Sequence, residues 1–367
     1  MKLKTLFLIT FLIFIASDLN AENSFKYPVH SLKEFRSSKK LTLCNETVPL
    51  DSQSVWEMLD REFVISVGNR PQVVMWLKRS KRYFPYIEAR LREKGLPEDL
   101  KYLAVIESAL MRYSYSQKGA VGSWQFIDGT AKRYNLRVNE WFDDRLNFSK
   151  STDAAIDYLR YLYKTFDSWA LAFAAYNCGE NRIKKEIIEQ GMNNYYKLNL
   201  PIETERFVFR ILTAKIILSN PENYGFHLDE DEYYHPVEFD EVWIDIPFNV
   251  RIRVIAEAAN SFFKEIKELN PEIRGYYLPQ GKHLIRIPKG NSGLFEENLQ
   301  IRLKRLAKEK IFHLYTVKEG DSLMSISRRF NVGVDSLEMW NGLEKKNFIY
   351  PGQKIKIYTE ALEEQGM

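Results

Sequence analysis

The sequence predicts a multidomain α+β protein, in which a mainly α-helical domain is followed by one or two small βααβ modules. Between about residues 86 and 220, apolar side chains recur every three or four positions, which is the period of a helix. From about residue 237 onwards, stretches of alternating apolar and polar residues flank short helical patterns and turn signals such as "EGDS" and "YPGQ". A chain of 367 residues is long enough for two or three domains.

The first 21 residues predict an export signal. The stretch "MKLKTLFLITFLIFIASDLNA" places two lysines before an apolar run, which leads into a short polar stretch that ends in Ala21. A secretory signal peptide has this order of parts. A membrane anchor is the alternative, but the apolar run is shorter than the about 20 residues that a spanning helix needs. We therefore expect cleavage after Ala21 and no stable membrane insertion after that cleavage.

The charge of the chain argues against a nucleic-acid partner, and its two cysteines leave two interpretations open. The chain carries 53 basic and 49 acidic residues, and its formal net charge is +4. Because the two signs are mixed and no long basic run occurs, a nucleic-acid partner is not expected. The two cysteines, Cys44 and Cys178, lie far apart in sequence. Two small buried thiols are the preferred interpretation, and a disulfide in an exported protein is the alternative.

Changes of pattern along the chain predict its divisions. These are a signal peptide at 1–21, a partly helical N-terminal extension at 22–85, the helical domain at 86–235, a degenerate module at 236–311, a second module at 312–360 and a tail at 361–367. The two modules echo each other. Each contains an apolar helix, a second helix that ends near Asn, then Pro and a final alternating strand. Such a repeat predicts tandem copies of one small fold.

A carboxylate interrupts an apolar stretch of the predicted helical domain. In "LKYLAVIESALM", residues 100–111, Glu107 occupies a position of the apolar stripe that runs through Leu103 and Leu110. Burial disfavours the charged form of a carboxyl and raises its pKa, which suits a general acid near neutral pH. The alternative is a structural glutamate that an Arg or Tyr holds in the core. The helix by itself does not decide between the two.

The next segment combines glycines with polar and aromatic residues. The stretch "SQKGAVGSWQF", residues 116–126, predicts a tight turn whose backbone a ligand can approach closely. Trp124 offers a stacking face and Gln125 a bidentate polar group, a pair that suits a sugar. An ordinary turn before a helix is the alternative, and we expect Asp128 or Thr130 to cap that helix.

Two strong helices follow this segment. The stretch "STDAAIDYLRYLYKTF" predicts a helix that begins near Ser151 or Thr152. The stretch "SWALAFAAYNCGENRI" predicts another, which ends at Gly179 just after Tyr176 and Asn177. The side chains of these last two residues either face a cleft or form a structural capping pair.

Four short motifs stand in a fixed order: "ES" at 107–108, "S..GA.G.WQF" at 116–126, "AAYN.G" at 174–179 and "ET" at 203–204. This order resembles the lytic transglycosylases that have a goose-type-lysozyme-like catalytic domain (SLT domain). The phrases "LPEDLKYLAVIESAL" and "KSTDAAIDYLRYLYKTF" are most similar to the membrane-bound lytic murein transglycosylase D group. The C-terminal stretch "YTVKEGDSLMSISRRF", with the later "IYPGQKIKI", resembles a LysM domain, a module that binds glycans containing N-acetylglucosamine.

The resemblance implies an enzyme of the periplasm or cell envelope that acts on peptidoglycan glycan strands. It would cleave the β-1,4 bond between N-acetylmuramic acid and N-acetylglucosamine and leave 1,6-anhydro ends. Glu107 would act as general acid and then as general base, without a metal or other cofactor. The implied glycan-binding residues of the helical domain are Ser108, Ser116, Gln125, Tyr176, Asn177 and Glu203. Those of the LysM domain are Gly320, Asp321, Ser322, Leu323, Pro351 and Gly352.

Several positions depart from the family pattern. Asp128 replaces a proline-like residue, Cys178 replaces Ala or Ser, Phe207 replaces Tyr, and residues 110–112 replace Phe-x-Pro. Phe207 has no hydroxyl to donate, and a carboxylate at Asp128 offers a base for water. The alternatives are therefore a muramidase that uses water and a catalytically inactive peptidoglycan-binding protein. We expect the degenerate module at 236–311 to brace the domains, with glycan binding as the alternative.

Overall fold

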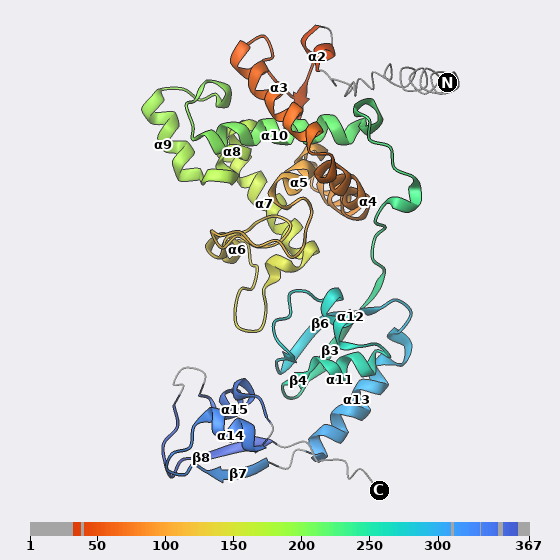
Figure 1. Cartoon of the computed structure of the whole chain (residues 1–367), viewed down its shortest axis with the longest axis vertical. Coiled ribbons are helices and arrows are strands. Elements are labelled where there is room, and N and C mark those ends of the chain that lie inside the picture. Colours follow the sequence, from red (N-terminus) through yellow and green to blue (C-terminus); the bar gives the residue numbers. More distant parts are fainter. Residues whose placement is uncertain (1–31, 38–39, 310–311, 331, 344–347, 359–367) are drawn as a thin grey trace, which may run out of the picture. The chain divides into compact units, whose positions relative to one another are not determined.

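The computed structural model describes residues 32–37, 40–309, 312–330, 332–343 and 348–358. The predicted signal peptide and C-terminal tail lie outside this range. Contacts divide the chain, whose course is drawn in Figure 1, into two compact units. The first unit contains the residues up to Met111 together with Ala155–His235. The second unit contains Arg112–Ala154 together with the residues from Pro236 onwards.

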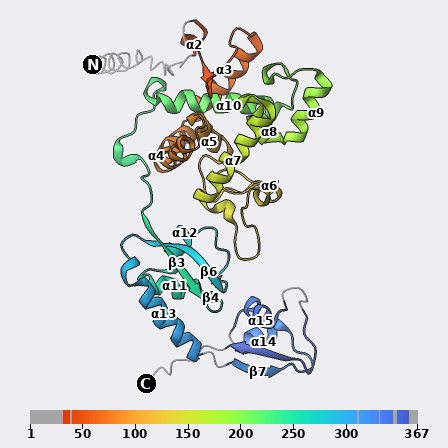
Figure 2. The same cartoon turned by 180° about the vertical axis from the view of Figure 1, so that it is seen from behind.

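The first unit is helical, apart from a short antiparallel pair of strands. Its elements are α2 (Lys33–Ser37), β1 (Thr42–Leu43), β2 (Glu46–Thr47), α3 (Gln53–Gly68), α4 (Arg70–Glu93), α5 (Lys101–Ser108), α8 (Trp169–Cys178), α9 (Glu180–Gln190) and α10 (Ile202–Ser219), with the later part of α7 (Phe148–Phe166). Helix α10 packs against α3, α5 and α8 (Figures 1 and 2). Because apolar side chains from Phe207 to Ile217 are buried around α10, this helix forms the centre of the unit.

Helix α5 ends earlier than its apolar stripe predicts. The stripe continues to Met111, but Ala109 and Leu110 have left-handed backbone angles, with φ of 53° and 60°. Their N–H groups donate to carbonyls of the preceding turn, which is the usual way to close a helix at its C-terminus. The guanidinium of Arg79 binds the Ala109 carbonyl at 3.0 Å. Glu107 therefore lies in the last turn of α5, at the point where the chain leaves the helix.

Two predicted helix starts were wrong by a few residues, and a third helix ends where expected. Helix α7 begins at Phe148 because Asn147 Oδ1 accepts the N–H of Lys150, so Asn147 is the cap in place of the predicted Ser151 or Thr152. Helix α6 (Asp128–Arg133) begins with Asp128 inside its first turn, and neither Asp128 nor Thr130 caps it. Helix α8 ends at Gly179, with φ of 92°, as predicted.

The second unit contains two small modules besides residues 112–154. The first module consists of β3 (Phe239–Ile246), β4 (Val250–Arg251), α11 (Ile252–Ala258), α12 (Phe263–Leu269), β5 (Tyr277–Leu278), β6 (Gly281–Pro288) and α13 (Ser292–Glu309). The second consists of β7 (Phe312–Thr316), α14 (Leu323–Phe330), α15 (Val334–Asn341) and β8 (Lys354–Tyr358). In each module the long strands pair antiparallel, β3 with β6 and β7 with β8. The α+β class and the βααβ modules are therefore confirmed.

The two modules share one pattern of side-chain hydrogen bonds, made by an asparagine near the end of the second helix. Asn270 follows α12, and Asn341 ends α15. The amide nitrogen of Asn270 donates to the carbonyl of Arg286, and its oxygen accepts the N–H of the same residue. Asn341 makes the same pair of hydrogen bonds with Lys356, and both amides also donate to the carbonyl four residues earlier. The predicted repeat is thus visible in the structure, because in each module an asparagine near the end of the second helix binds the backbone of the last strand.

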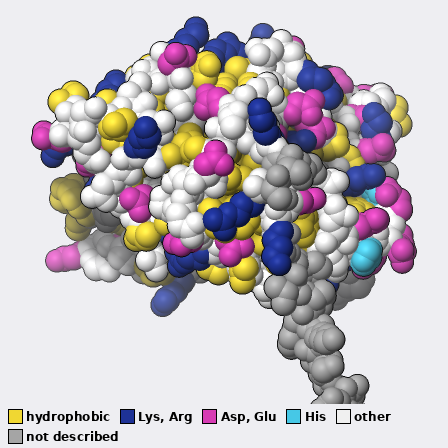
Figure 3. All heavy atoms as spheres, turned by 90° about the horizontal axis from the view of Figure 1, so that it is seen from above, with side chains coloured by type: hydrophobic (Ala, Val, Ile, Leu, Met, Phe, Trp, Pro, Cys, Tyr) yellow, Lys and Arg dark blue, Asp and Glu magenta, His cyan; other side chains and the backbone are white. Residues whose placement is uncertain are grey.

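The described surface carries mixed charges as the composition predicts, whereas only one of the two cysteines is buried: Cys44 is buried and Cys178 is partly exposed. On the face seen in Figure 3, basic and acidic side chains are interspersed, and neither sign forms a continuous patch. Cys44 and Cys178 are free thiols. Burial raises the pKa of the Cys44 thiol well above its usual value. Among the described residues, no helix is both long enough and apolar enough to span a bilayer.

Candidate active site

Glu107 lies among apolar side chains at the end of α5. Leu103 and Ala104, which precede it by one turn, are fully buried, while Glu107 itself keeps partial contact with solvent. Burial is the main cause that raises the pKa of this carboxyl to about 8, and the charge of Glu203 raises it further. The positive charge of Arg210 acts in the opposite direction. A carboxyl with this pKa holds its proton at neutral pH and can still be reached from outside.

Helix α8 brings a tyrosine close to this carboxyl. The ring of Tyr176 stacks obliquely on Tyr158, with centroids 5.2 Å apart, and the Tyr158 hydroxyl donates to Glu180 at 2.9 Å. Burial raises the pKa of Tyr176 well above its usual value, and the charge of Glu107 raises it further. The phenol therefore remains a neutral hydrogen-bonding group at any physiological pH.

Asn177 joins the end of α8 to the start of α10. Its Oδ1 accepts the hydroxyl proton of Thr204 at 2.9 Å, and Thr204 is buried. Of the two readings left open by the sequence, this contact supports a structural role for the Asn177 oxygen. Ser108 also serves the local structure, because it is buried and its hydroxyl donates to the Ala104 carbonyl. Both residues hold the helix ends that carry Glu107 and Tyr176.

Two charged residues of α10 act on Glu107 with opposite sign. Glu203 is exposed in the first turn of α10, and Arg210 lies two turns further along the same face. Burial lowers the pKa of Arg210, while the charges of Glu62 and Glu107 raise it. Glu62 is only 2% exposed and pairs with Arg206 at 2.7 Å. Sequence reasoning missed Glu62 and Arg210, although the seven-residue spacing from Glu203 to Arg210 indicates a shared helix face.

The glycine turn of residues 116–126 belongs to the second unit. The hydroxyl oxygen of Ser116 accepts the N–H of Ala120 at 2.9 Å. The side-chain amide of Gln125 donates to the carbonyls of Ser114 and Gly122, at 3.2 and 2.8 Å, and Gln125 has a left-handed φ of 49°. Both predicted glycan-binding side chains thus fix the backbone of this turn.

The predicted stacking role of Trp124 is wrong. Trp124 is fully buried, and its indole N–H donates to the hydroxyl of Thr152 in α7 at 3.0 Å. A large ring with one polar atom suits a core position that offers a single acceptor. Trp124 therefore fastens the turn to α7 and presents no face to a sugar.

Two of the four departures from the family pattern, Asp128 and Phe207, have surroundings that the structure describes simply. Asp128 is exposed and pairs with Lys132 at 2.8 Å, four residues along α6. Phe207 is 2% exposed and lies in the core around α10. A phenyl ring at position 207 therefore brings no polar atom into this core.

The predicted glycan-binding residues of the LysM module divide into two groups. Asp321 accepts the hydroxyl proton of Tyr315 at 2.6 Å and the N–H of Lys318 at 2.8 Å, so it stabilises its own loop. Ser322 and Ser325 exchange hydrogen bonds at the start of α14. Leu323 is buried in the module core. These three residues, Asp321, Ser322 and Leu323, build the module.

The remaining residues of that set lie at exposed turns. Gly320 and Gly352 have left-handed φ values of 84° and 88°, and Pro351 is exposed in the same turn as Gly352. Sequence reasoning missed the neighbouring aromatic pair of Phe348 and Tyr350, whose rings lie 5.5 Å apart and are mostly exposed. The signal was the tyrosine that directly precedes the Pro-Gly turn.

Family models match the chain in three places. The model for the transglycosylase SLT domain matches residues 84–199. The model described as "Lytic transglycosylase MltD, LysM-like domain" matches residues 239–302, and the LysM domain model matches residues 315–357. These matches confirm the predicted resemblance and identify the degenerate module as LysM-like.

The chain is also similar to curated relatives over much of its length, and part of it aligns with a solved structure. The chain is 29% identical over 293 residues to the membrane-bound lytic murein transglycosylase D of Escherichia coli strains K12 and O6:H1, a stretch that covers 76% of this chain. It covers 64% of those proteins, slightly less than two thirds of their length. A 51-residue stretch is 41% identical to N-acetylmuramoyl-L-alanine amidase XlyA of Bacillus subtilis and covers 14% of this chain and 17% of that protein. The 70 kDa soluble lytic transglycosylase of Escherichia coli aligns over 48% of this chain and 33% of its own, with 18% identity and a TM-score of 0.34. Residues 84–199 are therefore a transglycosylase SLT domain, which this chain joins to an MltD-type LysM-like domain and a C-terminal LysM domain.

Proposed function

We propose that this protein is an exported lytic transglycosylase, which cleaves the β-1,4 bond between N-acetylmuramic acid and N-acetylglucosamine in peptidoglycan. The observation that carries the proposal is the environment of Glu107, a partly accessible carboxyl whose pKa is raised to about 8 beside the partly buried phenol of Tyr176. Such a carboxyl is protonated when the substrate arrives, as a general acid must be.

In the proposed reaction one carboxyl acts twice, first as general acid and then as general base. Glu107 donates its proton to the glycosidic oxygen, and the bond from that oxygen to C1 of the muramic acid breaks. The resulting carboxylate then takes the proton of the C6 hydroxyl on the same sugar, while the C6 oxygen bonds to C1. The product is a 1,6-anhydro ring, water is not consumed, and Glu107 regains its proton. In this proposal the neutral Tyr176 hydroxyl stabilises charge that develops on the sugar.

The other predicted residues take supporting parts in this proposal. The residues that bind the glycan, or that hold the groups that bind it, are Ser108, Ser116, Gln125, Tyr176, Asn177 and Glu203. The LysM domain, through the turns at Gly320, Pro351 and Gly352, binds the same strands weakly. Such tethering raises the local concentration of glycan at the SLT domain. An export signal at residues 1–21 places the mature protein in the periplasm, where this substrate is found.

Hydrolysis by a muramidase is the second candidate, and one observation favours it. Glu203 is close enough to Glu107 for its charge to raise the pKa of that carboxyl, so a second carboxylate is present. Glycosidases that use water place two carboxyl groups about the scissile bond. Asp128, the other candidate base, is engaged by Lys132 on an exposed helix face.

Mass spectrometry of the digested wall distinguishes these functions. We expect peptidoglycan treated with the mature protein to release fragments that end in 1,6-anhydro-N-acetylmuramic acid. Fragments with reducing ends would identify a muramidase. Absence of any released fragment would identify a peptidoglycan-binding protein without activity.

The charges on α10 predict two opposite shifts of the pH profile. In Glu203→Gln, loss of a negative charge lowers the pKa of Glu107, so activity is lost at a lower pH than in the wild type. In Arg210→Gln, loss of a positive charge raises the pKa of Glu107, so activity persists to a higher pH. The measurement is kcat/KM between pH 5 and pH 10, whose alkaline limb reports the acid of the free enzyme. Arg210→Lys keeps the charge and serves as the control. A limb that moves in the same direction in both glutamine variants would contradict the assignment.

A further inference from the structure

Residues 141–143 of the SLT domain pair with residues 272–274 of the LysM-like domain. We call this pairing the joint. The N–H of Arg274 donates to the carbonyl of Trp141, and the N–H of Asp143 donates to the carbonyl of Glu272, both at 2.8 Å. Between them, Phe142 and Ile273 form an antiparallel bridge. The side chain of Phe142 is 7% exposed and packs in the hydrophobic core of the LysM-like domain.

A chain of charged groups crosses the joint. Arg274 Nη2 lies 2.8 Å from Asp143 Oδ2, and Arg145 binds both oxygens of the same carboxylate at 2.8 Å. Asp143 is 3% exposed and Arg145 is 7% exposed, whereas the Arg274 side chain is about half exposed. Burial acts to raise the pKa of Asp143, but hydrogen bonds and charges from Arg145 and Arg274 hold it below its usual value. Bidentate pairs of this kind fix the orientation of both partners.

Arg145 also binds the backbone of the glycine turn. Its Nη1 donates to the carbonyls of Gly119 and Phe126, at 3.1 and 3.2 Å. Those two residues lie within the turn that bears Ser116 and Gln125. One guanidinium therefore links Asp143 at the joint to two carbonyls of the turn.

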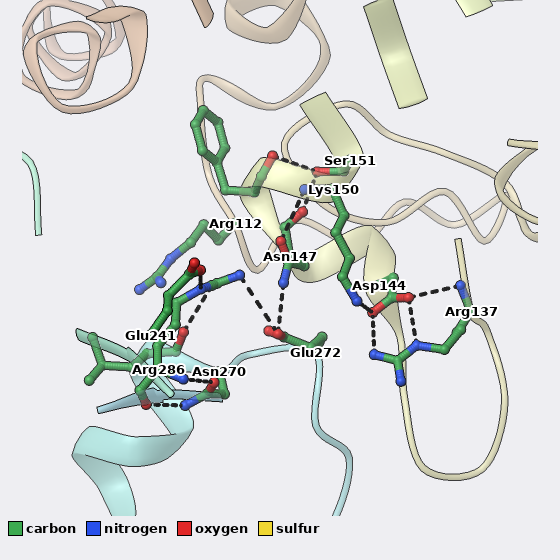
Figure 4. Close-up of polar contacts among 12 residues, drawn as sticks. Arg112, Arg137, Asp144, Asn147, Lys150, Ser151, Glu241, Asn270, Glu272 and Arg286 are labelled. Atoms are coloured by element: carbon green, nitrogen blue, oxygen red, sulfur yellow. Dashed lines mark hydrogen bonds and ion pairs between the residues drawn. The ribbon is translucent and has the colours of Figure 1, made fainter. Parts of the chain in front are cut away.

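A second contact crosses between the same two domains. Figure 4 shows Asn147 and Glu272 pointing toward each other, and Asn147 Nδ2 donates to Glu272 Oε1 at 2.7 Å. Asn147 is fully buried, and its own oxygen caps α7 through the N–H of Lys150. On the other side, Arg286 Nη2 lies 3.8 Å from Glu272 Oε1. Through Glu272, the LysM-like domain thus contacts Asn147, the residue that precedes α7. Through Arg274, it contacts Asp143, which is linked by Arg145 to the glycine turn.

We propose that the LysM-like domain is a positioning element for the glycine turn of the SLT domain, and that Arg274, Asp143 and Arg145 transmit this effect. Arg274 and Asp143 are positioning residues, because the contacts of the described residues link them to the turn through Arg145. The claim that the turn contacts glycan rests on the proposed function. The claim that Arg274 stabilises the turn does not, and it is tested without catalysis.

Hydrogen exchange of the full mature protein tests the structural part. The N–H groups of Val121 and Phe126 are bonded to each other's carbonyls, so their exchange reports on opening of the turn. In Arg274→Ala we expect exchange in the peptide covering residues 114–126 to accelerate roughly three- to tenfold. The matched control is Arg253→Ala, which removes an exposed arginine paired with Glu257 within α11. Its exchange in this peptide should equal that of the wild type.

Charge variants of Arg274 test the mechanism of the effect. Arg274 contacts Asp143 through its terminal nitrogen Nη2, a single point contact that an ammonium can replace, so Arg274→Lys should restore slow exchange. Arg274→Glu places a carboxylate beside Asp143 and should accelerate exchange more than Arg274→Ala does. Because the Arg274 side chain is about half exposed, we expect these variants to fold, and circular dichroism verifies it.

Kinetics with isolated glycan strands test the functional part. We expect Arg274→Ala to raise KM roughly three- to tenfold with little change in kcat, and Arg274→Lys to recover the wild-type value. A fall in kcat with unchanged KM would overturn the claim about glycan binding. Unchanged exchange in both Arg274→Ala and Arg274→Glu would overturn the positioning role itself. If the wild type releases no anhydro product, the proposed function fails, and the exchange comparison still decides about Arg274.

Discussion

Glu107→Gln is expected to lower the rate of glycan cleavage at least about a thousandfold, because one carboxyl supplies both proton transfers. Glutamine has nearly the same shape but can neither donate a proton to the glycosidic oxygen nor take one from the C6 hydroxyl. Binding of glycan strands should remain, since the residues proposed to bind them are unchanged. The measurement is release of anhydro-muropeptides, together with co-sedimentation of the variant with insoluble peptidoglycan.

The same variant should also change how stability depends on pH. Because the pKa of Glu107 is raised to about 8, the folded state keeps a proton that the unfolded state loses above about pH 4.5. Through this group the wild type therefore loses stability as pH rises from about 4.5 to about 8, and Glu107→Gln lacks this contribution. Each pKa unit corresponds to about 1.4 kcal/mol, so the variant should gain on the order of 2–4 kcal/mol relative to the wild type between pH 5 and pH 9.

Urea unfolding at pH 5 and at pH 9 measures this gain. Glu189→Gln, which neutralises an exposed glutamate of α9, is the control, and its difference from the wild type should be the same at both pH values. A variant at position 107 that cleaves at the wild-type rate would refute the catalytic assignment. An inactive variant without the pH-dependent gain would show that Glu107 is not held protonated by its surroundings.

Gly122→Ala is expected to disrupt the glycine turn. Gly122 has a left-handed φ of 85°, and a Cβ at this position would lie 2.1 Å from the backbone oxygen of Arg145. A backbone atom cannot move aside as a flexible side chain can. The left-handed conformation costs about 1–2 kcal/mol for a residue with a Cβ, and the overlap adds about 1–3 kcal/mol. The turn must therefore separate from Arg145, and we expect loss of stability of roughly 2–5 kcal/mol together with most of the activity.

Gly119→Ala is the matched control for this effect. Gly119 lies in the same turn with a similar φ of 78°, but no atom lies within 4 Å of the Cβ it would gain. Its cost should be limited to the backbone term of about 1–2 kcal/mol. Thermal unfolding and glycan cleavage of the two variants, measured side by side, separate the overlap with Arg145 from backbone strain. Equal losses in both variants would show that the contact with Arg145 does not matter.

Local patterns predicted the parts of the fold that depend on neighbouring residues. The end of α8 at Gly179 followed from a glycine that adopts a left-handed φ without strain. The repeat of the two modules followed from their shared order of helices, Asn, Pro and strand. The end of α5 did not follow, because Ala109 and Leu110 carry no sign of the left-handed conformation that they adopt. Tertiary contacts, such as that of Arg79 with the Ala109 carbonyl, select it.

The sequence predicted the acid of the candidate site, Glu107, but not the charged residues that surround it. Glu107 was visible because it breaks an apolar stripe. The influence of Arg210 and Glu62 was not, since it depends on how α3, α5 and α10 pack. Trp124 was misjudged because a sequence shows a ring but not whether it is covered. A large aromatic residue beside glycines is as well suited to fastening a turn as to stacking on a sugar.

The joint also has a consequence for how the protein is made. Arg274 follows Asp143 by 131 residues, so its partner leaves the ribosome long before it does. At about 5–20 residues per second, synthesis of the intervening chain takes roughly 7 to 26 s. During that time Phe142 has no apolar core to enter. A shortened chain that stops at residue 235 would keep this phenyl ring uncovered permanently, and we expect it to aggregate although its SLT domain is complete in sequence.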